Sequence, residues 1–462
     1  MRQLIFLMTR IVEHCIMESK IFSDLPMVKN AQRPRLPIVK KVINKDFPDI
    51  YSLNSDQEGL GVMCIDFVLK INYLGIFYKP QLVPYFSNNL LTAGSCNYNE
   101  FEISQLLQNL GAHFHCETNR MHSVISIYFM SSQIKKVLSV ISNFILSPTY
   151  PEKLIKDRIS NEKQSFMINM ERLSVHSRRR IKKKLYGELH PYGELVEKAD
   201  FEKISSKELI AFHRDFYNSD NLEIIISGDI PKGAVGYIYS AFSKVKKPSS
   251  DYIFRENSIF KSNRNILTPP FSKPSSDYIS RDSALQTAFR VAKILPGPSH
   301  KDFFALRVLV TILGGYFGSR LMKKIREEKG YTYGIGAYLV VEEKYSELHI
   351  VTEVGEKYTK LVLEEIIKEM EMLQNKEVGL QELDRVKAYL LGSLLHSCDG
   401  IFNQAILFRS LKRHNSSFNY INSFTDEIVA VTANKIIFLA KKYFNVDSFS
   451  FVACGPPERK LW

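Results

Sequence analysis

Residues 313–335 have the sequence LGGYFGSRLMKKIREEKGYTYGI, and no other stretch of this 462-residue chain is as informative about its fold. Apolar side chains recur at helical spacing over Ser319–Lys329, which predicts an amphipathic helix. We expect Gly330 to end this helix, because glycine adopts the left-handed conformation that often follows a helix. The chain then continues into a predicted strand that carries Tyr331 and Tyr333.

Three glycines, Gly314, Gly315 and Gly318, come just before this helix. We expect them to allow a tight turn into it, because glycine has no side chain to restrict the backbone. A phosphate-binding loop is not indicated, since no Gly-Lys-Ser/Thr follows them.

The order of predicted elements is the same on both sides of the middle of the chain. In the first half, the apolar pattern predicts strands at 62–71, 112–129 and 222–227 and helices at 100–110, 131–146 and 151–170. In the second half, it predicts strands at 284–295, 336–341, 347–352 and 448–454 and helices at 300–313, 358–373 and 380–396. This recurrence predicts an α+β fold of two homologous halves.

The boundary between the halves is marked by a duplicated heptapeptide. Lys-Pro-Ser-Ser-Asp-Tyr-Ile occurs at 247–253 and again at 273–279, in surroundings rich in Pro, Ser and Asn. A single short repeat of this composition indicates a linker or exposed loop rather than a solenoid. We therefore divide the chain into an N-terminal extension (1–34), a first domain (35–245), a linker (246–280) and a second domain (281–458).

The charge of the chain does not indicate a nucleic-acid partner. Its 62 basic and 49 acidic residues give a formal net charge of +13, which is scattered along the sequence. The densest basic cluster, at 178–184, has no interleaved aromatic residues. We expect this cluster to form a solvated helix face.

Cysteine usage and the absence of long apolar segments indicate a reducing, non-membrane compartment. The six cysteines are dispersed and form no C-x-x-C, namely Cys15, Cys64, Cys96, Cys116, Cys398 and Cys454. No stretch reaches the 18 or so apolar residues of a membrane-spanning helix, and the first residues lack the apolar run of an export signal. We expect a cytoplasmic protein, with a periplasmic location left open. Met17 and Met27 are alternative starts, so residues 1–30 need not belong to the mature protein.

Three segments in the same order resemble the pitrilysin/insulinase family of zinc peptidases, and the resemblance extends over roughly residues 35–457. The segments are LLTAGSCNYNEFEISQLLQNLGAHF (90–114), HPYGELVEKADFEKISSKELIAFHRDFY (190–217) and the stretch at 313–335. The resemblance implies two halves, each a mostly antiparallel sheet with helices packed on it, which face each other across a cavity.

Catalytic members of this family carry a His-x-x-Glu-His helix just before the position of Gly94. The two His bind zinc, and the Glu is the general base for water. Counting back from Gly94, these positions hold Tyr85, Asn88 and Asn89, which can neither bind zinc well nor abstract a proton. No His-x-x-Glu-His or reversed motif occurs elsewhere in the chain. The resemblance therefore predicts a chain without its own metal or cofactor.

The family's third zinc ligand, a Glu some seventy residues later, falls within residues 157–166. Glu162 and Gln164 fit its position about equally well. A different metal site would be formed if a turn near 117–120 placed His122 across from His113 and His115. No carboxylate or base is evident beside these histidines, which favours packed or exposed side chains.

The resemblance also assigns roles to Arg326 and Tyr333, which match the Arg and Tyr that bind the substrate carbonyl in this family. A guanidinium and a phenol can donate hydrogen bonds to the oxyanion that forms when water attacks an amide. The alternative is that Arg326 pairs with Glu327 or Glu328 and that Tyr333 is an ordinary strand aromatic.

Substrate-binding residues without a metal centre predict the metal-free subunit of a heterodimeric zinc metalloendopeptidase of bacterial type. Its partner would be a homologous subunit that carries His-x-x-Glu-His and the zinc, and its substrate an extended peptide. The alternative is a non-proteolytic scaffold similar to the core proteins of respiratory complexes. The Arg326 and Tyr333 pair favours the first interpretation, because a scaffold has no use for it.

Overall fold

The computed structural model describes residues 33–44, 47–55, 59–71, 82–119, 122–188, 190, 192–245, 247, 274–342, 344–413 and 416–457. The predicted N-terminal extension lies outside these residues except for its last two positions. Most of the predicted linker also lies outside them, including nearly all of the first heptapeptide copy.

The first half contains a six-stranded sheet with the order β1-β2-β6-β3-β5-β4. Its strands are β1 (Val39–Asn44), β2 (Phe47–Asn54), β3 (Val62–Lys70), β4 (His113–Thr118), β5 (His122–Met130) and β6 (Leu222–Gly228). All neighbouring pairs are antiparallel except β2 and β6. The helices of this half are α2 (Leu82–Asn89), α3 (Glu100–Asn109), α4 (Ile134–Leu146), α5 (Glu152–Met170), α6 (Leu173–Tyr186), α7 (Ser206–Phe216) and α8 (Ala234–Ala241). The range 112–129, where the apolar pattern predicted strand and a turn near 117–120 was considered, is a hairpin of β4 and β5.

The second half contains a five-stranded sheet with the order β7-β11-β8-β10-β9. Its strands are β7 (Ser276–Ser280), β8 (Gln286–Pro296), β9 (Thr332–Val341), β10 (Tyr345–Gly355) and β11 (Ser450–Gly455). Its helices are α10 (Phe303–Val310), α11 (Thr359–Asn375), α12 (Leu380–Ser397), α13 (Ile401–Arg413), α14 (Asn419–Ala430) and α15 (Ala433–Tyr443). The predicted pairing of the strands at 336–341 and 347–352 is confirmed by β9 and β10. β7 lies inside the range assigned to the linker, so the second sheet begins earlier than predicted.

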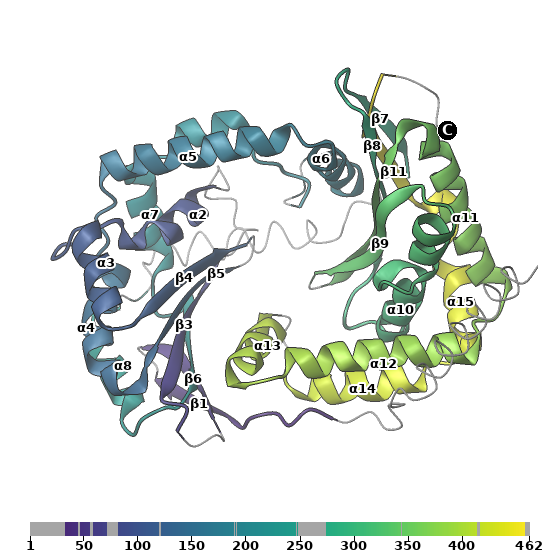
Figure 1. Ribbon diagram of the computed structural model, residues 1–462. Coiled ribbons are helices and arrows are strands. Elements are labelled where there is room, and N and C mark those ends of the chain that lie inside the picture. Colours follow the sequence, from purple (N-terminus) through teal and green to yellow (C-terminus); the bar gives the residue numbers. More distant parts are fainter. Residues whose placement is uncertain are drawn as a thin grey trace, which may run out of the picture.

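The predicted fold class is confirmed: each half is a mostly antiparallel sheet with helices packed on it (Figure 1). Each sheet and its helices enclose a separate apolar core. β6 is buried along its whole length, as its run of apolar residues predicted. α3 begins with a capping box in which Asn99 and Glu102 bind each other's backbone N–H groups.

Each half also contributes one helix to the sheet of the other half. α6, from the first half, packs against β8 and β11 of the second sheet. α13, from the second half, packs against β6 and β2 of the first sheet. In Figure 1 the two halves form a ring, with α5 and α6 bridging them on one side and α12 to α14 on the other. The halves are therefore coupled through two reciprocal helix contacts.

Most basic residues of the cluster at 178–184, which lies in α6, bind carboxylates. The predicted solvated helix face is therefore wrong for most of this cluster. Lys182 lies 3.1 Å from Glu347 of β10, and Lys184 lies 3.7 Å from Asp277 of β7. Arg180 also pairs with Asp277. The charge of this helix is used to attach it to the second sheet.

Two further sequence expectations concern thiols and membrane segments. Within the described ranges Cys64, Cys96, Cys116, Cys398 and Cys454 have free thiols, as their dispersed positions predicted. None of the helices in the described part of the chain combines the length and apolarity needed to cross a bilayer.

Candidate functional site

The first part of the site lies on α2, where the metal-binding positions are occupied by a hydrogen-bonded tyrosine. The Tyr85 hydroxyl donates to Glu162 Oε1 of α5 at 3.1 Å, and Arg158 Nε lies 3.8 Å from the same oxygen. Burial raises the pKa of Tyr85, and the neighbouring Glu162 raises it further, so the phenol keeps its proton at neutral pH. Of the two residues considered for the third ligand position, the structure brings Glu162 and not Gln164 to Tyr85.

Asn88 connects α2 to other elements of the fold, and Asn89 forms a hydrogen bond within α2. Asn88 is fully buried, and its Nδ2 donates to Thr118 Oγ1 at 3.0 Å while its Oδ1 accepts from the Tyr217 hydroxyl at 3.2 Å. The Asn89 Nδ2 donates to the backbone carbonyl of Tyr85 at 2.9 Å. Neither amide can act as a base, and both satisfy buried or half-buried polar groups of the fold.

The structure does not bring His113, His115 and His122 together, so these three histidines do not form the alternative metal site considered from the sequence. His113 pairs with Tyr128 and His115 with Ser126, whereas His122 lies at the far end of the β4–β5 hairpin. His122 is four positions from Ser126, the partner of His115, and four positions span about 13 Å along a strand. Across the described residues, no group of three or more His, Cys, Asp or Glu side chains is placed to hold a metal ion.

The second part of the site begins with Arg326, at the end of the predicted helix. The segment Met322–Glu328 is a π-helix, a form often found at functional sites. The Arg326 guanidinium lies over the Phe317 ring, 4.7 Å from its centroid. Glu328 pairs instead with Lys324 at 2.8 Å, and no carboxylate of the described chain lies within ion-pair distance of Arg326. The alternative in which Arg326 is neutralised by a neighbouring glutamate is therefore wrong.

Tyr333 lies at a bulge near the start of β9. Ile335 pairs with Thr352 but Thr332 pairs with Val354, so the register shifts and Tyr333 falls outside the regular ladder. The Thr352 hydroxyl donates to the Gly334 carbonyl at 2.9 Å, which satisfies a backbone group at the shift. The Tyr333 side chain is 94 % exposed. Bulges re-aim side chains in this way and are common beside active sites.

Tyr331 has a different environment from Tyr333, although they are two residues apart. Its ring stacks on Tyr358 with centroids 4.7 Å apart and packs against the second core. Tyr331 is thus a packing residue, and only Tyr333 is free to contact another molecule.

Of the three glycines before the helix, Gly314 allows close packing against β9 rather than a turn. A Cβ on Gly314 would lie 2.6 Å from the backbone nitrogen of Ala337, so only glycine lets this segment approach β9 so closely. The expectation that all three glycines serve a tight turn is corrected for Gly314. Gly330 has a φ of +64° directly after the π-helix, as its predicted role as a helix terminator requires.

The two parts of the site belong to different halves. α2 and β9 both lie on the inner side of the ring in Figure 1. Among the described residues, no hydrogen bond or ion pair joins Arg326 or Tyr333 to the positions on α2. The sequence left Glu162 and Gln164 as equal candidates for the third ligand position, and the hydrogen bond of Glu162 to Tyr85, 77 residues away, distinguishes them.

Family models match most of the described chain. A model of the insulinase family (peptidase family M16) matches residues 83–190, and a model of the peptidase M16 inactive domain matches residues 203–390. A Bacillus subtilis protein named uncharacterized zinc protease YmxG is 25% identical over 148 residues, which are 32% of this chain and 36% of that protein. A Helicobacter pylori protein named non-peptidase homolog YmxG is 32% identical over 129 residues, 26% of each chain. The chain thus spans about a third or less of these relatives.

Solved structures with the same fold cover nearly the whole chain. The peptidase M16 inactive domain from Pseudomonas fluorescens has a TM-score of 0.77 at 21% identity and covers 91% of this chain and 99% of that one. A protease from Helicobacter pylori has a TM-score of 0.72 at 17% identity, and the match covers 91% of this chain and 100% of that one. The periplasmic protease PqqL from Escherichia coli has a TM-score of 0.73 at 12% identity, and the match covers 92% of this chain and 46% of that one. These likenesses establish the fold.

Proposed function

The chain belongs to the insulinase (M16) peptidase family, and from this premise we propose that it is the metal-free, substrate-binding subunit of a heterodimeric zinc metalloendopeptidase. A homologous partner with a His-x-x-Glu-His helix supplies the zinc and the general base. This chain supplies Arg326 and Tyr333 to the composite site.

The proposal rests on the observation that the Tyr333 hydroxyl and the Arg326 guanidinium have no acceptor among the described residues. Tyr333 is 94 % exposed at a bulge, and the guanidinium of Arg326 is stacked on Phe317 without a carboxylate from the described chain. A phenol and a guanidinium with no acceptor among the described residues are available to an oxyanion on a bound substrate. Such donors stabilise the transition state more than the ground state, because the negative charge develops only during attack on the amide.

The metal has to come from outside this chain, which is why the proposal includes a partner. The position of the first His ligand holds Tyr85, whose hydroxyl is bound to Glu162. The position of the general base holds the fully buried Asn88. Neither residue can generate the nucleophilic water that zinc peptidases need.

The substrate class follows from the edge of the second sheet. β9 is the edge strand of that sheet, and Tyr333 is the second residue of this strand. An extended peptide that pairs with an edge strand gains main-chain hydrogen bonds without a sequence requirement. We therefore expect extended or unfolded peptides as substrates, bound with a scissile carbonyl near Tyr333.

The isolated chain should contain no stoichiometric zinc and should cleave no peptide. The reason is that Tyr85, Asn88 and Asn89 occupy the ligand and base positions. Elemental analysis of the purified chain checks the metal, and a quenched fluorescent peptide library checks the activity. About one zinc per chain that is lost on replacing His113 or His115 would contradict the proposal.

A matched gain-of-site variant makes the zinc test sharper. The triple change Tyr85→His, Asn88→Glu and Asn89→His restores the motif beside Glu162, which already lies at hydrogen-bond distance from position 85. This variant should bind about one zinc per chain, because three N and O ligands complete a catalytic type of site. Failure to bind zinc in a folded variant would mean that Glu162 is not in the third ligand position.

A further inference from the structure

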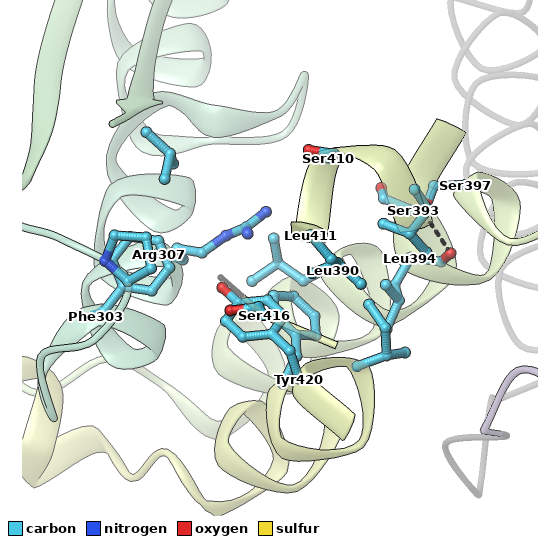
Figure 2. Close-up of a pocket in the computed structure, with 15 residues that line it drawn as sticks. Phe303, Arg307, Leu390, Ser393, Leu394, Ser397, Ser410, Leu411, Ser416 and Tyr420 are labelled. Atoms are coloured by element: carbon cyan, nitrogen blue, oxygen red, sulfur yellow. Dashed lines mark hydrogen bonds between the residues drawn. The ribbon is translucent and has the colours of Figure 1, made fainter. Parts of the chain in front are cut away.

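The second half contains a cavity of about 360 Å³ that the peptidase-like site does not use. Helices α10, α12, α13 and α14 form its walls, and it is lined mainly by apolar side chains such as Phe303, Leu390 and Leu411. Figure 2 shows the Arg307 side chain reaching from α10 into this space, toward Leu411 and Tyr420. The volume lies in the range of small-molecule sites, roughly 300–1,000 Å³.

Arg307 is the charged group of this cavity, and its charge is not neutralised. The guanidinium lies 4.9 Å from the centroid of the Phe424 ring, and Tyr420 lines the same cavity. No Asp or Glu is among the described residues that line the cavity, and no carboxylate of the described chain forms an ion pair with Arg307. Burial lowers the pKa of this guanidinium, and Tyr420 raises it, but an arginine remains charged at neutral pH.

Arg307 is half-buried, and a partly desolvated guanidinium without a carboxylate partner in the described chain favours a bound anion. Buried charges in proteins are paired as a rule, because desolvation of an isolated ion is expensive. Arginine presents a planar fork of donors that suits a carboxylate. Tyr420 lines the same cavity, so its hydroxyl is a second donor available to the carboxylate.

We propose that this cavity binds a small amphipathic carboxylate, with its acid group on Arg307 and its apolar body against the leucine and phenylalanine side chains. One positive charge without other ionised lining residues matches a monoanion. The apolar walls match a hydrocarbon or aromatic body rather than a bare inorganic anion.

The position of the cavity gives such a ligand contact with the joint between the halves. Leu407, Ser410 and Leu411 of α13 face the cavity, while Phe408 and Arg409 of the same helix contact the first sheet. Phe408 lies 5.5 Å from the Tyr51 ring, and Arg409 lies 3.3 Å from Asp66. A ligand in the cavity therefore touches a helix that both halves share.

Isothermal titration calorimetry of the full chain with three probes tests the proposal. Octanoate carries both the acid and the apolar body, octan-1-ol lacks the acid, and acetate lacks the body. The wild-type chain should bind octanoate at least tenfold more tightly than either control, because hydrogen bonds to a charged group contribute to affinity on this scale. Equal affinity for octanoate and octan-1-ol, or no binding of any probe at millimolar concentration, would refute it.

Two variants of Arg307 connect the binding to this residue. Arg307→Met keeps an aliphatic stem against Phe424 but removes the charge. The affinity for octanoate should therefore fall at least tenfold, while the affinity for octan-1-ol should change by less than about twofold. Arg307→Lys keeps the charge and should retain part of the preference for octanoate. Circular dichroism confirms that both variants are folded. If octanoate binds Arg307→Met as well as wild type, the arginine only packs on Phe424 and the proposal is wrong.

Discussion

Replacing Tyr333 with phenylalanine should lower the turnover of the reconstituted peptidase complex by roughly 10²–10³-fold, or about 3–4 kcal/mol of transition-state stabilisation. The change removes a single hydroxyl and keeps the ring. Since the side chain is 94 % exposed and outside the regular ladder, its loss should not disturb the fold. Substrate affinity should change less than the rate, because the hydroxyl meets a charge that exists mainly in the transition state.

The assay uses the chain combined with its zinc-bearing partner and compares wild type, Tyr333→Phe and Arg326→Lys. Tyr331→Phe is the matched control, because Tyr331 lies two residues away but stacks on Tyr358 inside the fold. This control should cleave at the wild-type rate, and the complex should form with all four proteins. If Tyr333→Phe and Arg326→Lys also cleave at the wild-type rate in an intact complex, the pair is a relic and the chain is a scaffold.

The sequence was sufficient to predict many of the elements and their order, because apolar periodicity depends on local geometry, but β1, β2 and α13 to α15 were not predicted. The helices at 151–170 and 380–396 and the paired strands at 336–341 and 347–352 appear within a residue or two of their expected bounds or as parts of longer strands. The exchange of α6 and α13 between the halves was not predictable in this way. Their apolar faces show that they are buried but not against which sheet.

The candidate site shows the same division. The identities of Tyr85, Asn88 and Asn89 were enough to argue against a metal site on α2. The bulge that exposes Tyr333 depends on how β9 pairs with β10, and no local pattern encodes that register shift. The contact of Glu162 with Tyr85 depends on where the fold places α5 relative to α2, which also lies beyond the local sequence.

The largest expected effect on stability comes from Glu347, a fully buried residue of β10 at the contact with α6. Its carboxylate accepts hydrogen bonds from Lys182 at 3.1 Å, from His349 at 2.7 Å and from the Tyr186 hydroxyl at 2.5 Å. Glu347→Ala should lower the free energy of unfolding by about 3–5 kcal/mol, because it leaves buried donors and the Lys182 charge without their acceptor. Urea unfolding followed by circular dichroism measures the loss.

Glu188→Ala is the matched control for this change. Glu188 lies just after α6 and pairs with Lys183 of that helix at 3.2 Å, but the Glu188 side chain is 77 % exposed. Exposed ion pairs contribute little to stability, so this variant should unfold close to the wild-type urea concentration. Equal losses for Glu347→Ala and Glu188→Ala would mean that the buried cluster does not hold α6 on the second sheet.

The pH dependence of a third variant, Glu347→Gln, separates the charge of Glu347 from its hydrogen bonds. Burial alone would raise the pKa of this carboxyl, but the hydrogen bond from His349 and the charge of Lys182 hold it at about 2, below its ordinary value of 4.5. A carboxyl with a lowered pKa stabilises the folded state above pH 4.5, and this contribution is lost as the pH falls toward 2. The stability difference between wild type and Glu347→Gln should therefore be greatest above pH 4.5 and shrink as the pH is lowered toward 2. A difference that stays constant between pH 6 and pH 3 would show that geometry, and not the negative charge, makes Glu347 important at this contact.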